Sequence, residues 1–350
     1  AEWVYGRSLL MEDYSWNDFL LGMEFSVPFL LILTVHEFGH YFTARFHRVK
    51  ATLPYYLPLP PGFIMPSIGT LGAVIRIKDR VRTNVQHFDI GLAGPLAGFV
   101  VALLILIYGF ITLPPAEHIY SFHPEYKSFG LQYADHVYTK EYLAEHKVLD
   151  MQFGSNLLFE LLKLLVDDPA RIPNPHELMH YPLLMAGFIA LFFTSMNLLP
   201  IGQLDGGHVT YGLFGYKGHE QIATVFFLLL LFYSGLGMVT PYDKESLMWS
   251  VPLTIGFYYL CMGALQVAVL NRIMFALLLF AFQFLLAWVF PSLTGYSGWL
   301  LFGFVVSRFV GIQHPPSEIE VPLDNTRIVL GWITLLIFIL CFSPAPIMIS

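Results

Sequence analysis

The chain has 350 residues, of which 56% are hydrophobic and only 12% are charged, and its mean hydropathy is +0.63. Soluble domains carry about 25% charged residues, so this composition excludes a soluble globular protein and predicts a polytopic membrane protein. The formal net charge of -7 argues against nucleic acid as a partner, because nucleic acid requires a basic face. The two cysteines, Cys261 and Cys341, both lie in apolar segments, which indicates no disulfide framework.

The first apolar run covers residues 19–35 and is broken only by Glu24. It predicts a membrane-spanning helix that continues to about Phe46, with Asn17 or Asp18 as its N-terminal cap. The residues before this run lack a basic start followed by a short apolar core, so we expect no cleavable signal peptide.

The run ends in His36-Glu37-Phe38-Gly39-His40. On a helix, His36 and His40 project from one face, about one turn apart. Two imidazoles at that spacing can hold one zinc ion, with Glu37 placed to take a proton from a metal-bound water. The same pattern also arises by chance in proteins that bind no metal. An unpaired ionisable side chain inside a membrane helix costs about 2.5–3.5 kcal/mol, however, so three such groups together indicate a metal site.

The loop after this helix is the most basic in the chain. Its basic residues are Arg45, Arg48, Lys50, Arg76, Lys78, Arg80 and Arg82. By the positive-inside rule this loop is cytoplasmic. We therefore expect the amino terminus outside and the zinc motif in the cytoplasmic half of the first span.

Within this loop, residues 54–66 contain too many prolines for a helix, and residues 71–78 (L-G-A-V-I-R-I-K) are typical of a strand. The strand could serve only as scaffolding. Alternatively, its open edge could pair with an unwound substrate segment. In that case the substrate-binding residues would be Leu71, Gly72, Ala73, Val74 and Ile75.

The second expected span, about residues 92–113, opens with A-G-P-L-A-G, whose small residues favour close helix packing. Residues 114–181 carry ten acidic and five basic side chains, which suits an outside loop. Within this loop, residues 153–166 are apolar but too short to span, so we place them at the interface. Six histidines are scattered through the loop: His118, His123, His136, His146, His176 and His180. Surface histidines are the favoured interpretation, and a second metal site is the alternative.

The third span begins near Pro182 and ends in N-L-L-P-I-G-Q-L-D-G-G-H, residues 197–208. Further apolar runs cover residues 222–239, 249–270, 273–290, 298–310 and 328–342, with a polar connector at 311–327. The predicted fold is an all-α polytopic membrane protein with about eight transmembrane helices (six to eight) and a small membrane-associated β-hairpin or strand region. We divide it into a core, residues 1–218, and additional transmembrane helices, residues 219–350. The core holds the first three spans, the membrane-associated segment 51–90 and the outside loop.

A catalytic zinc usually has three protein ligands and a water. Asp205 is the best candidate for the third ligand, because it ends an apolar run beside glycines. The second span leads out and the third leads back, so Asp205 reaches the same side of the membrane as His36 and His40. Asp205-Gly206 taken alone would be an ordinary turn.

Together, H-E-F-G-H, A-G-P-L-A-G and N-x-x-P leading into L-D-G resemble, in this order, the site-2 proteases, which are intramembrane zinc metalloproteases. The resemblance covers about residues 19–218 and implies a three-helix catalytic core with one zinc per chain. By matching position, His36, His40 and Asp205 are its ligands, Glu37 is the general base, and Asn197 stabilises the oxyanion.

The resemblance also implies that the substrate is a single-span membrane protein cut in or near its transmembrane segment within the lipid bilayer, as in regulated intramembrane proteolysis. No PDZ or CBS domain is apparent, and Gly202-Gln203 stands where many members have Pro-Pro. These features resemble the PDZ-less branch of cyanobacteria and chloroplasts, which also occurs widely in bacteria. We expect a prokaryotic cytoplasmic membrane. The sequence carries no indication of an oligomeric state.

Three other functions compete with this interpretation. A metal transporter would repeat its ligands in symmetry-related halves, and the sequence shows no repeat. A non-catalytic scaffold that binds membrane helices would not need the intact set His36, Glu37, His40 and Asp205. A membrane protease that clips prenylated tails would take its third ligand from a Glu on a later helix, and no apolar span after Tyr211 offers one.

Overall fold

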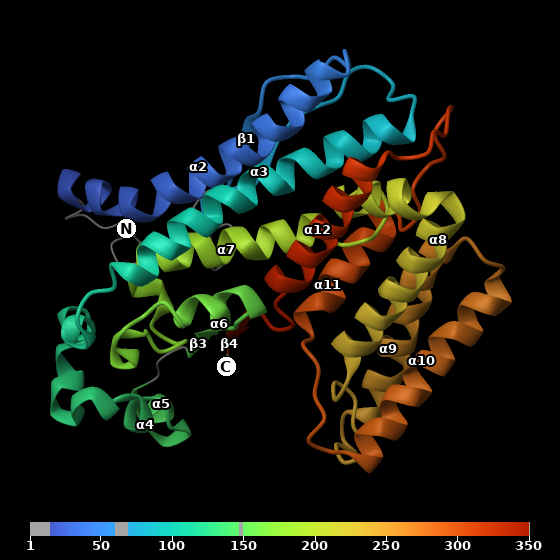
Figure 1. Cartoon of the computed structure of the whole chain (residues 1–350). Coiled ribbons are helices and arrows are strands. Elements are labelled where there is room, and N and C mark those ends of the chain that lie inside the picture. The colour runs from blue at the N-terminus through green and yellow to red at the C-terminus, as the bar shows by residue number, and fades with distance from the viewer. Residues whose placement is uncertain (1–14, 60–68, 147–149, 350) are drawn as a thin grey trace. The chain divides into compact units, whose positions relative to one another are not determined.

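A computed structural model of the chain describes residues 15–59, 69–146 and 150–349. Helices dominate the fold, and the strands form two small two-stranded sheets (Figure 1). Part of the predicted proline-rich segment, residues 60–66, lies outside the described residues. The second sheet, between β3 (Met151–Phe153) and β4 (Ile347–Ile349), was not expected from the sequence.

Each of the eight predicted spans coincides with a helix. They are α2 (Trp16–Phe46), α3 (Asn84–Ile111), α7 (Pro182–Asn197), α8 (Asp205–Gly235), α9 (Leu247–Cys261), α10 (Val269–Val289), α11 (Gly298–Val305) and α12 (Asn325–Cys341). By length and composition, four helices of the described residues could cross a membrane: α2, α3, α9 with the turn that follows it, and α10. Shorter apolar helices lie at α7, α11 with its continuation, and α12. The chain is a multi-pass membrane protein, and the number of eight crossings stays a prediction.

By its internal contacts the chain forms two compact units. Unit 1 comprises Ala1–Arg80, Leu92–Asn197 and Ile333–Ser350, and unit 2 comprises Val81–Gly91 and Leu198–Trp332. The predicted functional division at residue 218 stays a prediction. Each unit is described by itself below.

In unit 1, α2 begins with a capping box in which Ser15 is the N-terminal cap. The Ser15 hydroxyl accepts a hydrogen bond from the backbone N–H of Asp18, and the Asp18 carboxylate accepts one from the backbone N–H of Ser15 (2.8 Å). The prediction of Asn17 or Asp18 as the cap was wrong, because Asp18 occupies the third helical position. Downstream, α2 packs against α7, where the rings of Phe29 and Phe193 lie 6.1 Å apart.

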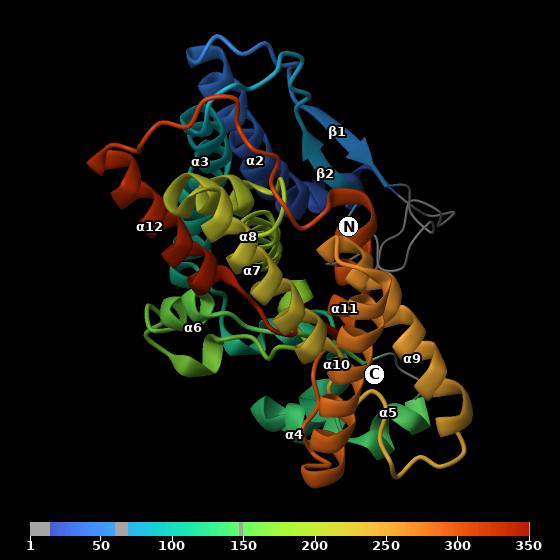
Figure 2. The ribbon, with the colours of Figure 1, turned by 90° about the vertical axis from the view of Figure 1, so that its right-hand side faces the viewer.

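The predicted strand is shorter than expected and has a partner. β1 (Tyr55–Pro58) pairs antiparallel with β2 (Thr70–Val74), and Figure 2 shows the two strands side by side. Gly72 has φ +110°, a conformation that side chains rarely adopt, and the register shifts between Tyr56 and Pro58. The hairpin is therefore confirmed, but β1 already occupies one edge of β2.

The predicted outside loop, residues 114–181, lies in unit 1, and its described residues form mainly short helical segments. They are η1 (Ala116–Ser121), η2 (Pro124–Gln132), α4 (Ala134–Val137), α5 (Lys140–His146), α6 (Leu157–Lys163), η3 (Pro169–Arg171) and η4 (Leu178–His180). Within the apolar segment 153–166, the helix is limited to α6. The first residue of the segment, Phe153, belongs to β3 and is buried against Phe188.

In unit 2, α8, α9, α10 and α11 form a bundle, continued by η5 (Met262–Leu265) and η6 (Val306–Val310). Buried polar contacts hold it: Tyr258 donates a hydrogen bond to Gln283 (2.8 Å), whose amide donates to two carbonyls of α8. The predicted polar connector, residues 311–327, is mostly without regular secondary structure before α12 begins at Asn325, and Asn84 bonds both backbone groups of Val321. Arg327 then forms a bidentate ion pair with Asp89, both bonds 2.8 Å long.

Candidate metal centre

His36, Glu37 and His40 form one buried cluster on α2, with exposed fractions of 5%, 8% and 7%. The Nε2 atoms of the two histidines lie 3.0 Å apart, and Glu37 Oε1 lies 4.0 Å from His36 Nε2. The four-residue spacing on a regular helix brings the two imidazoles to one face, as the sequence predicts. The carboxylate beside them is close enough to exchange a proton with a molecule held by both rings.

The small residues of A-G-P-L-A-G pack directly against this cluster. A Cβ at Gly94 would lie 2.1 Å from His40 Nε2, and a Cβ at Gly98 would lie 3.0 Å from His36 Cβ. Only glycine leaves room for His40 at the first position. The prediction of close helix packing at this motif is confirmed, and the motif positions the histidines as well.

Asn197, the last residue of α7, joins the cluster from another helix of unit 1. Its Nδ2 lies 3.4 Å from His36 Nε2. This amide can donate hydrogen bonds beside the paired imidazoles. The sequence links Asn197 to the site only through family resemblance, and the fold brings it there across 161 positions.

The donor set fits a zinc ion. Neutral imidazole is a preferred zinc ligand, and two ligands about 2.0–2.1 Å from a tetrahedral ion lie about 3.3 Å apart. The observed Nε2–Nε2 distance of 3.0 Å is within a few tenths of an ångström of that separation. The site is also buried in an apolar helix, where uncompensated polar groups are costly.

Asp205 is the first residue of α8 and belongs to unit 2. Its glycine neighbour allows a close backbone approach: a Cβ at Gly206 would lie 1.9 Å from the carbonyl oxygen of Leu198. The role of Asp205 as the third ligand stays a prediction.

The proposed substrate strand packs against the helix that carries the metal motif. β2 packs against α2, and the hydroxyls of Thr34 and Tyr56 form a hydrogen bond that joins α2 to β1. Four of the predicted substrate-binding residues, 71–74, lie in β2, and Ile75 follows its end. Substrate binding there stays a prediction.

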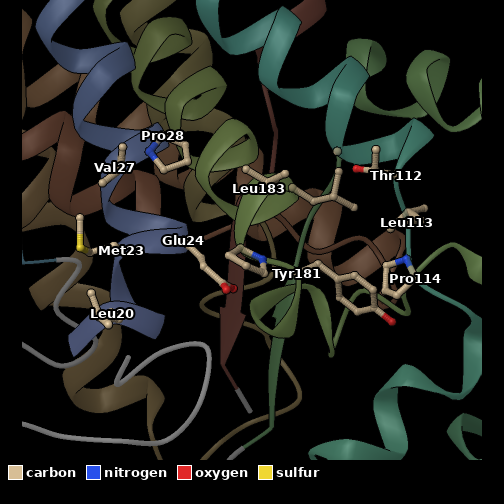
Figure 3. A pocket seen from close by; sticks show the side chains of 13 residues that line it. Leu20, Met23, Glu24, Val27, Pro28, Thr112, Leu113, Pro114, Tyr181 and Leu183 are labelled. Atoms are coloured by element: carbon tan, nitrogen blue, oxygen red, sulfur yellow. The ribbon is translucent and has the colours of Figure 1, made fainter. Parts of the chain in front are cut away.

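A cavity of about 530 Å³ lies elsewhere in unit 1, between the first half of α2, the end of α3 and the start of α7 (Figure 3). Its walls are mostly apolar, and Glu24 is the one charged side chain among the residues that line it. His36, Glu37 and His40 are not among them. The cavity is therefore separate from the metal centre.

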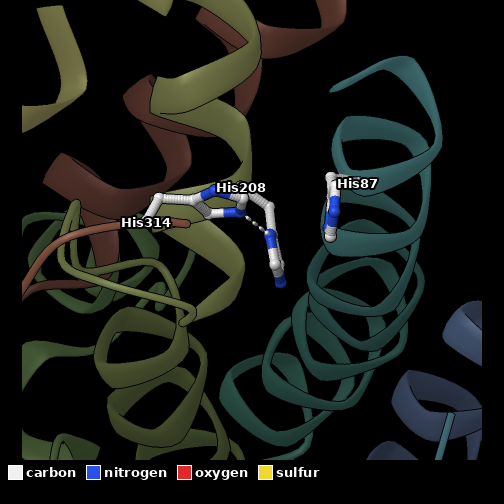
Figure 4. A group of neighbouring side chains, drawn as sticks. All are labelled: His87, His208 and His314. Carbon is white, nitrogen blue, oxygen red and sulfur yellow. Dashed lines mark hydrogen bonds between the residues drawn. The ribbon is translucent and has the colours of Figure 1, made fainter. Parts of the chain in front are cut away.

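The sequence analysis missed a histidine cluster in unit 2, formed by His87, His208 and His314 (Figure 4). His208 Nδ1 and His314 Nε2 lie 2.8 Å apart, and the ring of His87 stacks on that of His208 with centroids 5.1 Å apart. The three residues come from separate segments, so no spacing in the sequence points to them.

A second cluster, in the outside loop, consists of His123, Glu177 and His180. The interpretation of the loop histidines as surface residues is wrong for His180, whose side chain is 11% exposed, and holds for His136 and His146, which are exposed. The three-residue spacing of Glu177 and His180 was the one available indication in the sequence.

No solved structure matches this chain. Among curated proteins, EGY2 of Oryza sativa subsp. indica, named a probable chloroplastic zinc metalloprotease, is 26% identical over 230 residues, which are 61% of this chain and 36% of that protein. EGY1 of Arabidopsis thaliana, with the same description, is 29% identical over 202 residues, which are 58% of this chain and 31% of that protein. The chain thus spans about a third of the length of the curated relatives it matches.

The model of "Peptidase family M50" matches residues 24–234, more than half of the chain. The match includes the H-E-F-G-H motif, the A-G-P-L-A-G motif and Asp205. The relatives are of the EGY type, which lacks PDZ domains, as inferred from the motifs. Zinc is the metal that the family implies, and His36, Glu37 and His40 are a candidate site for it. The chain belongs to peptidase family M50, the site-2 protease family of intramembrane zinc metalloproteases.

Proposed function

We propose that this chain hydrolyses peptide bonds in or near transmembrane segments of membrane-bound regulators. The observation that carries the proposal is the paired imidazoles of His36 and His40, 3.0 Å apart beside Glu37 in a helix apolar enough to span a membrane. Family membership supports it. The proposed location is a cytoplasmic membrane of prokaryotic type, with the active site toward the cytoplasm and the amino terminus outside.

Each of the predicted site residues has a separate role in the proposed reaction. His36 and His40 would hold the zinc ion together with Asp205, the predicted third ligand. When bound, zinc supplies a Lewis acid for peptide hydrolysis. Glu37 takes a proton from the attacking water and returns it to the leaving amine. Asn197 donates a hydrogen bond to the carbonyl oxygen as negative charge develops on it.

The substrate we propose is a single-span membrane protein. Its helical carbonyls are already hydrogen-bonded, so a segment must unwind before hydrolysis. β2 is a candidate to hold that segment by backbone pairing, because it packs against α2, the helix that carries the metal motif. β1 pairs with one edge of β2, so the substrate would pair with the other edge. The alternative remains that the hairpin only supports α2.

The test is cleavage of candidate single-span proteins by the purified chain in lipid vesicles, with and without a zinc chelator. The Glu37→Gln variant is the control, because it keeps the ligand set and removes the base. We expect cleavage by the wild type with zinc, and none with chelator or with Glu37→Gln. A reaction that survives both treatments would overturn the mechanism. Ion transport that survives Glu37→Gln would favour a metal carrier.

A further inference from the structure

The outside-loop cluster contains three ligand atoms that converge. His123 Nε2 lies 3.2 Å from His180 Nε2 and 3.7 Å from Glu177 Oε2, and His180 Nε2 lies 3.4 Å from the same carboxylate oxygen. His123 precedes η2, whereas Glu177 and His180 flank and end η4. Three potential metal ligands from two separate segments therefore face one point.

These separations match the edges of a tetrahedral zinc site. Zinc binds histidine nitrogen and carboxylate oxygen at about 2.0–2.2 Å, so neighbouring ligand atoms lie about 3.3–3.6 Å apart. The rings of His123 and His180 are near perpendicular, at 71°, with centroids 5.2 Å apart. Two imidazoles in this arrangement can direct their Nε2 atoms to one ion without stacking.

The outer atoms of the cluster have partners that orient the inner ones. His123 Nδ1 lies 3.2 Å from Glu125 Oε1, so an Nδ1–H donor leaves the Nε2 lone pair for a metal. The Tyr138 hydroxyl donates to Glu177 Oε1, which leaves Oε2 facing both imidazoles. Tyr138 is itself held against His176, with ring centroids 3.9 Å apart.

Burial of the Glu177 carboxylate favours a cation beside it. The Glu177 side chain is 3% exposed. A buried carboxylate is stable in its charged form only beside a cation or strong donors. His123 is 31% exposed, so water can enter as a fourth ligand.

The unit 2 cluster is less suited to a metal. Figure 4 shows the nitrogen of His208 directed at His314, with the ring of His87 lying flat against His208 rather than edge-on to a shared point. It also has no carboxylate in its set. Hydrogen bonding and stacking account for its geometry.

We propose that His123, Glu177 and His180 form a second zinc site, on the outside loop. The ion would join the start of η2 to η4, which leads directly into α7 and its terminal Asn197. The chain would then bind two zinc ions, rather than the one expected from family resemblance. The competing arrangement is a direct contact of His123 with Glu125 and Glu177, with no metal.

The test is the zinc content of the full chain purified in detergent and dialysed against a defined zinc buffer. We expect two zinc ions per wild-type chain, and one in the double variant His123→Ala/His180→Ala. His36→Ala/His40→Ala should keep the loop zinc, so the result does not depend on the proposed protease function. The matched control His136→Ala/His146→Ala, which changes two exposed loop histidines, should keep both ions.

Two outcomes of the zinc measurement would overturn the proposal. One is a wild type that binds zinc only through His36 and His40. The other is zinc retained in full by His123→Ala/His180→Ala, which would place the second ion elsewhere. The double variant could lose zinc because it misfolds. The single variant His123→Ala changes only a partly exposed side chain, so its zinc content tests the site without that risk. Co²⁺ in the His36→Ala/His40→Ala background provides a spectroscopic check: a tetrahedral spectrum that His123→Ala abolishes supports the site, and an octahedral spectrum contradicts it.

Discussion

Two clusters of histidine and glutamate in unit 1 have similar composition but are built differently. His36, Glu37 and His40 lie within five residues of one helix, whereas His123 and His180 are 57 positions apart. In the helical cluster, Glu37 Oε1 lies 4.0 Å from His36 Nε2. In the loop cluster, Glu177 Oε2 lies 3.4 and 3.7 Å from the two imidazoles. This difference is consistent with the proposed roles, in which Glu37 is a base beside a metal and Glu177 is a metal ligand.

The two clusters also differ in what holds them. The helical cluster is held by the backbone of α2 and by the close approach of Gly94 and Gly98. The loop cluster is held by aromatic stacking: His123 stacks on Tyr126 with centroids 4.5 Å apart, and His180 on Phe122 at 4.2 Å. Local helix geometry brings the two imidazoles of the first cluster to one face, where α3 packs against them, whereas the second cluster depends entirely on the tertiary packing of short segments. The following predictions test this difference.

Glu37→Gln should have the largest effect. General acid–base catalysis contributes about 10²–10⁴-fold to rate, and the variant loses the proton acceptor while keeping both imidazoles. We expect a loss of cleavage of that size with unchanged zinc content. Rates are measured on a reconstituted single-span substrate, and zinc on the same preparation. Equal loss of zinc and activity would indicate that Glu37 is a metal ligand, as proposed for Glu177. The two clusters would then not differ in the role of their carboxylate.

Asp205→Ala should weaken zinc binding at the helical cluster alone. Loss of an outer partner already costs about 10–100-fold in metal affinity, and loss of a ligand should exceed that. Competition with a chelator measures the affinity, and Asp167→Ala, in the outside loop, is the control. Unchanged zinc affinity in Asp205→Ala would mean that the third ligand is another residue.

Zinc should stabilise the loop cluster by mass action. In the His36→Ala/His40→Ala background, a free zinc concentration 100 times the Kd should add about 2.7 kcal/mol to the free energy of unfolding. Thermal unfolding measures this as a rise in Tm, which the additional changes His123→Ala and His180→Ala should abolish. An equal rise in the quadruple variant would show that the stabilising zinc binds outside the loop cluster.

Gly94→Ala should displace His40, because the new Cβ would lie 2.1 Å from His40 Nε2. Overpacking of this kind costs about 1–3 kcal/mol. We expect a lower Tm and a loss of zinc at the helical cluster, with the loop zinc retained. Gly256→Ala is the matched control, because nothing lies within 4 Å of a Cβ there. A Gly94→Ala variant with normal zinc binding would show that α3 does not position the histidines.

Tyr138→Phe should have the smallest effect. It removes the hydroxyl that donates to Glu177 but keeps the ring against His176. Zinc affinity at the loop cluster should fall about 10–100-fold, the usual cost of losing an outer partner. Tyr142→Phe, on a ring stacked with the exposed His146, is the control. If both variants bind zinc as the wild type does, the Tyr138 hydroxyl does not orient Glu177.

Much of the fold follows from local sequence. Each predicted span coincides with a helix, because an apolar segment in a bilayer must satisfy its backbone hydrogen bonds within itself. The errors occurred where local rules compete. Ser15 rather than Asn17 or Asp18 caps α2, although S-x-x-D was readable as a capping box. β2 ends at Val74, and the expected pairing beyond it continues only as the isolated bridge between Ala51 and Ile77.

By itself, the sequence determined the family through its motifs, and it placed His36 and His40 on one face of a helix, because a four-residue spacing covers about one helical turn. Only the tertiary structure brought Asn197 to His36 and joined His123 to Glu177 and His180. Those contacts connect segments whose separation along the chain carries no geometric information. They depend on how side chains pack once the helices and loop segments have formed, which no periodicity in the sequence records.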